Sequence, residues 1–360
     1  MKRILCLILS LCLALCGCAK QEQSRDTVSL WYVQGQEPAG LEKLVNEYNE
    51  SLSASLLKVT LRSFPHEQAL AAAFDMRPPD LMLCYHTKAA QLCDQGRLRD
   101  CAAADLQYAE GIEQSLAFAG KSYFPLGVQV QLLAEAEAVF GDDELRDLES
   151  FCTAAKEYSL RKGRPAFTAD DFSQLFSHAL VSLDTEFHAD IGMDKNGDIF
   201  KYVYNLLAET AMEGGMLATE YSAVDILLNE QLPYALTLST ELVKASDKLS
   251  ARPEPTFRNS LKYPGLCIGF AVTAGEGRSL KSVENFLNYV NQTGRNSSLA
   301  LGAGLVPALP DMQQRETSLE NCLMEIGAFY ELYLPSADSD YMKNRLRFEA
   351  VFRNTVNRLY

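Results

Sequence analysis

An alternation of strand-like and helix-like segments over residues 28–98 constrains this chain more than any other feature. The segments are, in order, a β-rich strand at 28–33, a helix beginning at 41, an alternating strand at 55–64, a helix at 67–74, a buried strand entered from a loop at 78–85 and a helix at 89–98. The first helix shows apolar residues at 41, 44, 45 and 48, the spacing of one helix face. Strand, helix, strand, helix, strand is typical of a doubly wound α/β unit.

The rest of the chain is mostly helical, with three further strand-like runs. A strand leaves the first unit after Pro125, and apolar runs at 232–240 and 265–275 are separated by a proline-rich segment. Helices are predicted at 144–159, 172–183, 199–212, 280–291, 296–303, 317–334 and 340–359. The chain contains no internal repeat and no low-complexity tract.

The N-terminus has the pattern of a secretory signal. Lys2 and Arg3 precede an apolar run that ends near Cys16, which is shorter than the ~20 residues that span a bilayer. Leu15-Cys16-Gly17-Cys18 resembles the bacterial lipobox, which implies a signal peptide at 1–17, a diacylated Cys18 and a polar tether at 18–26. The alternative is an ordinary signal peptide with incidental cysteines. The lipobox interpretation places the folded body on the extracytoplasmic face of a cell membrane, anchored by lipid.

The net charge and the cysteine pattern limit the classes of partner and cofactor that we expect. The chain has 33 Lys and Arg against 47 Asp and Glu, a formal charge of −14 that disfavours nucleic acid and anionic lipid. Beyond Cys18, the cysteines at 84, 93, 101, 152, 267 and 322 form no C-x-x-C pair and no metal-ligand spacing with the four histidines, so we predict neither metal nor cofactor. Cys93 and Cys101 could close a disulfide loop, or remain buried thiols.

Four stretches, in order, resemble the extracellular solute-binding family 1 lipoproteins, the receptors of ABC importers for sugars and related solutes. They are "VSLWYVQGQEPAGLEKLVNEYNES", "RPPDLMLCYHTKAAQLCDQGRLRD", "LLNEQLPYALTLST" and "SVENFLNYVNQTGRNSSLALGAGLVPAL". The resemblance implies a two-lobed periplasmic-binding-protein-like fold of type II, in which crossing strands join two doubly wound sheets and a cleft lies between the lobes. It implies a first lobe of 27–125 plus 265–310 and a second lobe of 126–264 plus 311–360. It also implies a monomer without enzymatic activity that passes a small polar solute, such as a sugar or oligosaccharide, to ABC permease subunits.

Candidate solute contacts follow from that fold, because ligands of open α/β sheets lie beyond the carboxyl ends of the strands. The candidates are Gln34, Gln36, Glu37, Tyr85 and His86 on the first lobe, Gln129 on the crossing strand, and Ser239, Thr240, Glu241 and Tyr263 on the second lobe and returning hinge. The loop at 34–37 could instead be solvated, with Glu37 stabilising the next helix. His86 could be structural. Trp31, the single tryptophan, is expected in the core.

Residues 131–143 depart from the family, which usually shows a Tyr-Tyr-Asn-like stretch there. This departure keeps a second function class open, a sensor or scaffold lipoprotein with a lost or altered pocket. An apolar, filled junction between the lobes would favour that class, and a polar one would count against it. A third class is a glycoside hydrolase, although no carboxylate pair is marked. The segment 194–198 resembles part of a calcium loop, but the first and twelfth positions of that loop would be Gly192 and Val203, which supply no carboxylate, so we predict a turn.

Overall fold

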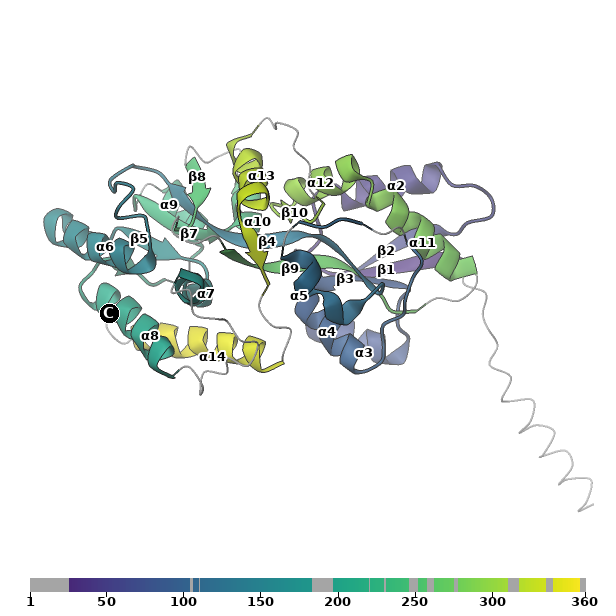
Figure 1. The fold of residues 1–360 in the computed structure, drawn as a ribbon, viewed down its shortest axis with the longest axis horizontal. Coiled ribbons are helices and arrows are strands. Elements are labelled where there is room, and N and C mark those ends of the chain that lie inside the picture. The colour runs from purple at the N-terminus through teal and green to yellow at the C-terminus, as the bar shows by residue number, and fades with distance from the viewer. Residues whose placement is uncertain are drawn as a thin grey trace, which may run out of the picture.

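The computed structural model describes residues 26–103, 106–109, 111–182, 197–219, 221–229, 231–245, 252–257, 262–274, 278–309, 317–334 and 339–356. Figure 1 shows an elongated molecule in which two groups of helices and strands lie on either side of two long central strands, β4 (Tyr123–Glu135) and β9 (Lys262–Val272). We name these groups the first lobe, which holds the N-terminal strands, and the second lobe, which holds α6–α9 and α14.

The first lobe confirms the predicted alternation. Its elements are β1 (Thr27–Val33), α2 (Leu41–Glu50), β2 (Lys58–Phe64), α3 (Glu67–Met76), β3 (Leu81–Tyr85), α4 (His86–Asp94) and α5 (Ile112–Ser115), joined later in the chain by α11 (Arg278–Val290), α12 (Thr293–Gly302) and β10 (Val306–Pro307). Helix α2 buries Leu41, Leu44, Val45 and Tyr48, the face that the sequence spacing predicts. Trp31 is buried beside Phe64, as expected for a core residue.

The second lobe is built on a half-sheet of mostly shorter strands, with many helices around it. Its elements are α6 (Leu148–Lys162), β5 (Phe167–Ala169), α7 (Phe172–Ser182), α8 (Gly197–Met212), β6 (Met216–Leu217), α9 (Ala223–Leu228), β7 (Tyr234–Leu238), α10 (Ser239–Ala245), β8 (Arg252–Pro255), α13 (Ser318–Phe329), β11 (Glu331–Tyr333) and α14 (Ser339–Val356). Helices α13 and α10 lie close to the central strands (Figure 1).

Strand β4 belongs to both halves of the sheet. The main strand order is β2-β1-β3-β9-β4-β7-β5-β6. Residues 123–130 of β4 pair antiparallel with β9, whereas residues 131–135 pair with β7 on one side and β8 on the other. The change of partners at Val130 and Gln131 is the point where one lobe passes into the other.

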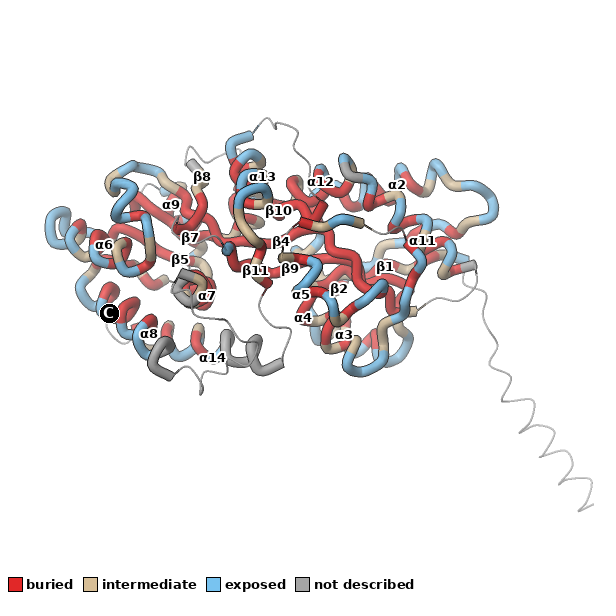
Figure 2. The backbone as a smooth tube through the Cα atoms, viewed as in Figure 1, coloured by how far each residue is buried: buried red, intermediate tan, exposed pale blue. Residues whose placement is uncertain are grey.

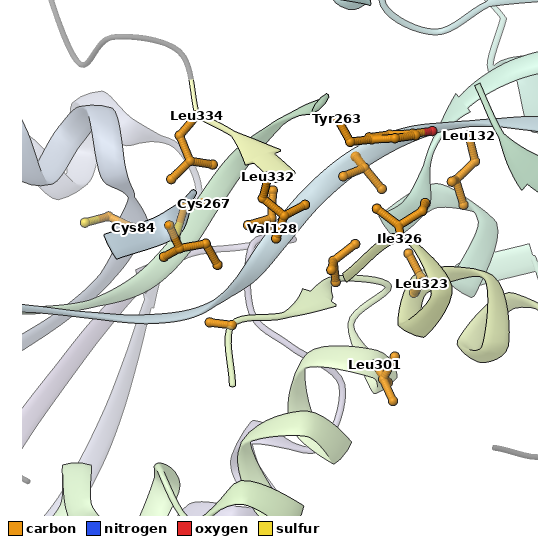
Figure 3. Close-up of a cluster of buried hydrophobic side chains, with 14 of the residues drawn as sticks. Cys84, Val128, Leu132, Tyr263, Cys267, Leu301, Leu323, Ile326, Leu332 and Leu334 are labelled. Carbon is orange, nitrogen blue, oxygen red and sulfur yellow. The ribbon is translucent and has the colours of Figure 1, made fainter. Parts of the chain in front are cut away.

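Three apolar clusters hold this arrangement together, and buried backbone runs through both halves in Figure 2. One cluster lies under α2, α11 and α12 of the first lobe, and another lies between β7, α6 and α8 of the second. The third, which we name the junction cluster, extends from the first lobe across the central strands to α13 and β11. Figure 3 shows part of it: Val128, Leu132, Tyr263, Cys267, Leu323, Ile326 and Leu332. Because burial of apolar area stabilises both lobes at once here, the two halves share a core.

One prediction about the later chain is wrong in detail. The predicted helix at 317–334 ends at Phe329, and residues 331–333 form β11, which pairs in parallel with residues 262–264 of β9. Pairing with a free strand edge outweighs helix propensity at this site. The proline-rich segment contains β8, an edge position where proline does not break a ladder.

Several predictions lie outside the described residues. These are the signal peptide at 1–17, the lipidated Cys18, most of the tether, and the first three positions of the 194–198 turn. The lobe boundaries at 125/126 and 264/265 remain predictions. Within the part of the chain that the structure describes, no helix combines the length and apolar character needed to cross a bilayer.

Candidate functional site

The carboxyl ends of the parallel strands meet at the junction of the lobes. Strand β3, parallel to β1, ends at Tyr85, and β7, parallel to β5, ends at Leu238. Because β4 joins the two half-sheets, both ends are brought to the middle of β4. Loops and helix starts at such an edge are where open α/β sheets hold ligands.

Three predicted site residues are joined there by hydrogen bonds. Tyr85 Oη donates to Gln129 Oε1 over a long 3.4 Å, and Gln129 Nε2 donates to Thr240 Oγ1 at 2.8 Å. Gln129 is only 6 % exposed, and Ser239 Oγ accepts from the backbone N–H of Val130 at 3.2 Å. The structure therefore brings Tyr85, Gln129, Ser239 and Thr240 together across the junction.

A second glutamine on β4 was missed by the sequence reasoning. Side chains alternate along a strand, so Val128, Val130 and Leu132 face the junction cluster while Gln129 and Gln131 share the opposite face. Gln131 is fully buried, and its Nε2 donates to the backbone carbonyl of Asp171 at 3.0 Å. Alternation in "GVQVQLL" is the signal that could have identified it, because glutamines at every second position of a buried strand must find polar partners.

Carboxylates gather beside Gln131, at the start of α7. Asp171 Oδ1 and Glu349 Oε2 both accept from the backbone N–H of Ser173, at 2.9 and 3.1 Å. Glu349 Oε1 accepts from Arg353 Nε at 2.6 Å. Burial raises the pKa of Glu349, and the neighbouring Asp171 carboxylate raises it further.

Asp170 extends this group toward β7. Its Oδ1 accepts from Ala223 N at 2.7 Å, its Oδ2 accepts from Thr237 Oγ1, and its backbone carbonyl accepts from Arg353 Nη2 at 2.9 Å. Burial raises the pKa of the Asp170 carboxyl. We name Asp170, Asp171 and Glu349 the carboxylate cluster. An Asp-Asp pair directly after the strand at 167–169 could have pointed to two of its members.

The loop at 34–37 is at the end of β1, but its described contacts are local. Gln34 and Glu37 are exposed, and Gln36 is half-buried. Gln34 Nε2 donates to Ser63 Oγ at 3.5 Å, and Glu37 Oε2 accepts from the backbone N–H of Gly35. Helix α2 begins after Gly40, so Glu37 stabilises the turn rather than the first turn of the helix. These three residues stay a prediction as solute contacts.

The structure places two predicted contacts in the interior. Tyr263 is 1 % exposed; its Oη donates to the backbone carbonyl of Gln131 at 2.7 Å and accepts from Thr256 N at 2.7 Å. A ring enclosed in this way offers no face on which a solute could stack, which counts against the prediction that Tyr263 contacts the solute. His86 is also buried, at the start of α4, as its structural alternative requires.

Glu241 lies at the surface of α10 in an ion pair. Its Oε1 accepts from Lys244 Nζ at 2.7 Å, one turn further along the helix. The pair is largely solvated, so it contributes little to stability and leaves Glu241 a prediction as a solute contact.

The cysteines in the described residues are free thiols, including Cys93 and Cys101, so the disulfide alternative is not realised in this structure. Burial raises the pKa of Cys101 to about 11 and that of Cys152 to about 12, which keeps these thiols protonated and inert. No group of three or more His, Cys, Asp or Glu in the described ranges could hold a metal ion.

The chain has the two-lobed fold of periplasmic-binding proteins, which confirms the predicted fold class. An ABC substrate-binding protein from Listeria monocytogenes in complex with cycloalternan superposes with a TM-score of 0.71 at 11% identity, covering 93% of this chain and 94% of that chain. A maltodextrin binding protein from L. casei gives 0.66 at 12% identity, covering 92% and 93%. The spermidine/putrescine ABC transporter substrate-binding protein from Streptococcus pneumoniae gives 0.67 at 11% identity, covering 92% and 99%.

These similarities concern the fold alone, since the identities are low. No protein-family model and no curated protein matches the chain. Function must therefore be argued from the site.

Proposed function

We propose that this protein is a lipid-anchored, extracytoplasmic solute-binding protein that captures a small polar solute, a carbohydrate by preference, and delivers it to an ABC importer. The observation that carries the proposal is the hydrogen-bonded row Tyr85–Gln129–Thr240, which spans the junction from the end of β3 to the start of α10. Amide and hydroxyl groups that offer both donors and acceptors suit the hydroxyl pairs of a sugar.

The proposed mechanism is closure of the two lobes around the solute. A solute that bonds Tyr85 from the first lobe and Thr240 from the second has contacts that exist together only when the lobes are close. Its differential affinity for that state shifts the population toward closure. The closed form is then the species that an importer recognises.

A thermal-shift screen of the purified mature protein against sugars, polyols, amino acids and peptides tests the proposal. We expect one class to raise the melting temperature, and calorimetric titration to give stoichiometric binding. Absence of any stabilising solute would refute solute binding, and release of a cleaved product from an oligosaccharide would move the protein to the hydrolase class.

Substitution of Gln129 locates the site. We expect Gln129→Met to weaken binding of the screened solute by about tenfold, the equivalent of one good hydrogen bond to a polar ligand. The matched control is Gln231→Met, at an exposed position on the second lobe. Equal affinities of the wild-type and Gln129→Met proteins would place the site elsewhere.

The second candidate function is a sensor or scaffold lipoprotein on the same fold. The junction cluster favours it, because one face of β4 is apolar and filled where the lobes meet (Figure 3). The polar face with Gln129 and Gln131 favours solute binding instead. Capture of a protein partner by a body that binds no solute in the screen would support the second candidate.

A further inference from the structure

Two short strands from different lobes meet end to end beside β4. Strand β10 of the first lobe pairs with residues 127–128 of β4, and β7 of the second lobe pairs with residues 131–135. Both run antiparallel to β4, so the carboxyl end of β7 faces the amino end of β10. Figure 1 shows β10 and α10, the helix that follows β7, beside β4 at the centre of the molecule. Residues 129–130 of β4 therefore lie in the gap between a first-lobe strand and a second-lobe strand.

The first turn of α10 fills this gap. The backbone N–H of Val130 donates to Oγ of Ser239 at 3.2 Å, where a continuous strand would supply a backbone carbonyl. Ser239 is the first residue of α10 and is 0 % exposed. The next residue, Thr240, accepts from Gln129 Nε2 at 2.8 Å. From the first lobe, Gly304 approaches so closely that a Cβ added there would lie 2.4 Å from the carbonyl oxygen of Ser239. The start of this second-lobe helix is thus held against β4 and the first lobe together.

The bond between Val130 and Ser239 stabilises the closed arrangement of the lobes selectively. While the lobes are together, the N–H of Val130 is enclosed and needs the Ser239 hydroxyl as its acceptor. When the lobes part, the gap between β7 and β10 widens and water can accept from the same N–H. A buried donor without an acceptor is costly, whereas a hydrated donor is not. Loss of the hydroxyl would therefore raise the free energy of the closed form and leave that of the open form nearly unchanged.

We propose that Ser239 is a positioning residue for the solute site, a tie that holds the lobes closed and sets how often the site opens. Its side chain is enclosed and its Oγ is used by Val130, so it acts on the solute through the placement of Gln129 and Thr240. The solute enters when the tie releases, and its apparent affinity falls with the fraction of open protein. The inference rests on the proposed function, because it concerns entry to that site, but its first test needs no solute.

Hydrogen exchange of the wild-type mature protein, with no solute added, tests the tie without a substitution. If the lobes part while each stays folded, the N–H of Val130 exchanges through an opening that exposes little surface. Its exchange rate should then change little up to about 1 M urea. The N–H of Leu30 lies in the centre of the first-lobe sheet and should exchange more slowly, with a rate that rises steeply with urea. One common rate for both amides would show that Val130 opens only by unfolding, which refutes the tie.

Substitution of Ser239 tests its effect on solute entry by stopped-flow measurement of association. Because the solute enters through the open form, the association rate is proportional to the open fraction, and Ser239→Ala should raise this rate about tenfold. The matched control is Ser282→Ala: Ser282 is also 0 % exposed, and its Oγ accepts from the N–H of Leu57 at 2.9 Å within the first lobe. Both variants should melt at a lower temperature, but the control should associate within about twofold of wild type, since its open fraction is unchanged.

The outcomes separate this inference from the proposed function. Equal association rates of the Ser239→Ala and wild-type proteins, with solute bound by both, would refute the tie and leave solute binding intact. Equal acceleration by the two alanine variants would show a general loosening of the fold and refute it as well. A blank solute screen would reject the proposed function, and the exchange rates of Val130 and Leu30 would still decide whether the lobes are tied.

Discussion

Tyr263 joins three strands through one hydroxyl group. From β9 it donates to the carbonyl of Gln131 on β4 and accepts from the backbone N–H of Thr256, directly after β8. Thr256 Oγ1 donates to the same carbonyl at 2.8 Å. A hydroxyl with both bonding directions occupied and a ring in the junction cluster is a structural group.

We expect Tyr263→Phe to lower the free energy of unfolding by about 1–3 kcal/mol, because it leaves a buried N–H of Thr256 without its acceptor. Denaturant unfolding of the ligand-free protein measures this. Tyr221→Phe is the control, at an exposed side chain. A stability equal to wild type, with weaker solute binding, would return Tyr263 to the binding site.

The buried imidazole of His178 predicts that the free energy of unfolding depends on pH. It is 4 % exposed on α7, edge-on to Phe257 and Tyr263 at 5.9 and 5.1 Å. Burial lowers the pKa of its imidazole to about 3, against about 6.5 in an unfolded chain. Below about pH 6.5 the unfolded state therefore binds a proton at His178 that the native state does not bind. The contribution of His178 to stability is lost as the pH falls through this range.

The expected slope is about 1.4 kcal/mol of unfolding free energy per pH unit between about pH 6 and pH 4. His178→Phe keeps an aromatic ring and removes the titration, so the difference between the two proteins isolates this group from the carboxyls. Parallel curves of stability against pH would contradict a buried neutral histidine.

At the scale of elements, the turn between α12 and β10 packs directly against the start of α10. Gly304 has φ +73°, and a Cβ added there would lie 2.4 Å from the carbonyl oxygen of Ser239. The first-lobe turn and a second-lobe site residue are thus in direct contact, and only glycine allows both the backbone angle and the approach.

Gly304→Ala should lower the free energy of unfolding by about 1–3 kcal/mol and weaken solute binding, because the turn must move away from Ser239. Gly294→Ala, in the preceding helix α12, places a Cβ that meets no atom within 4 Å, and we expect it to be neutral or stabilising by up to about 1 kcal/mol. Thermal melts and titrations of the two variants side by side decide this. Equal behaviour would show that the contact does not constrain the turn.

At the scale of the molecule, the proposed anchor and the acidic body suit an extracytoplasmic receptor. A formal charge of −14 disfavours adsorption to anionic membrane surfaces, so membrane attachment of the body would depend on the proposed lipid on Cys18.

We expect Cys18→Ser to abolish attachment, so that the protein is released or accumulates as precursor. Fractionation of cells into membrane and soluble material, with and without detergent, measures the change. Cys6→Ser within the apolar run is the control and should remain membrane-bound. Membrane retention of Cys18→Ser at the wild-type level would refute the lipobox interpretation.

Much of the fold was predictable because its information is local. Apolar residues 41, 44, 45 and 48 repeat with helical period, and the strands at 28–33 and 265–275 are rich in residues that suit a buried sheet, so element type followed from spacing. The end of the helix at Phe329 could not be predicted from local sequence. It depended on a free edge of β9 supplied by a segment more than sixty residues away.

The same division holds for the site. Tyr85, Ser239 and Thr240 were predictable, since each lies at the end of a strand or within two residues after it, and the edge rule needs only strand order. Gln131, Asp171 and Glu349 were not, because their meeting depends on how β4, α7 and α14 pack in space. The sequence by itself determined which segments become strands and helices, since hydrophobic period acts within a few residues. Tertiary structure alone decided that Tyr263 is enclosed and that Gln131 is buried against the backbone carbonyl of Asp171, because burial and hydrogen-bond partners depend on neighbours distant in the chain.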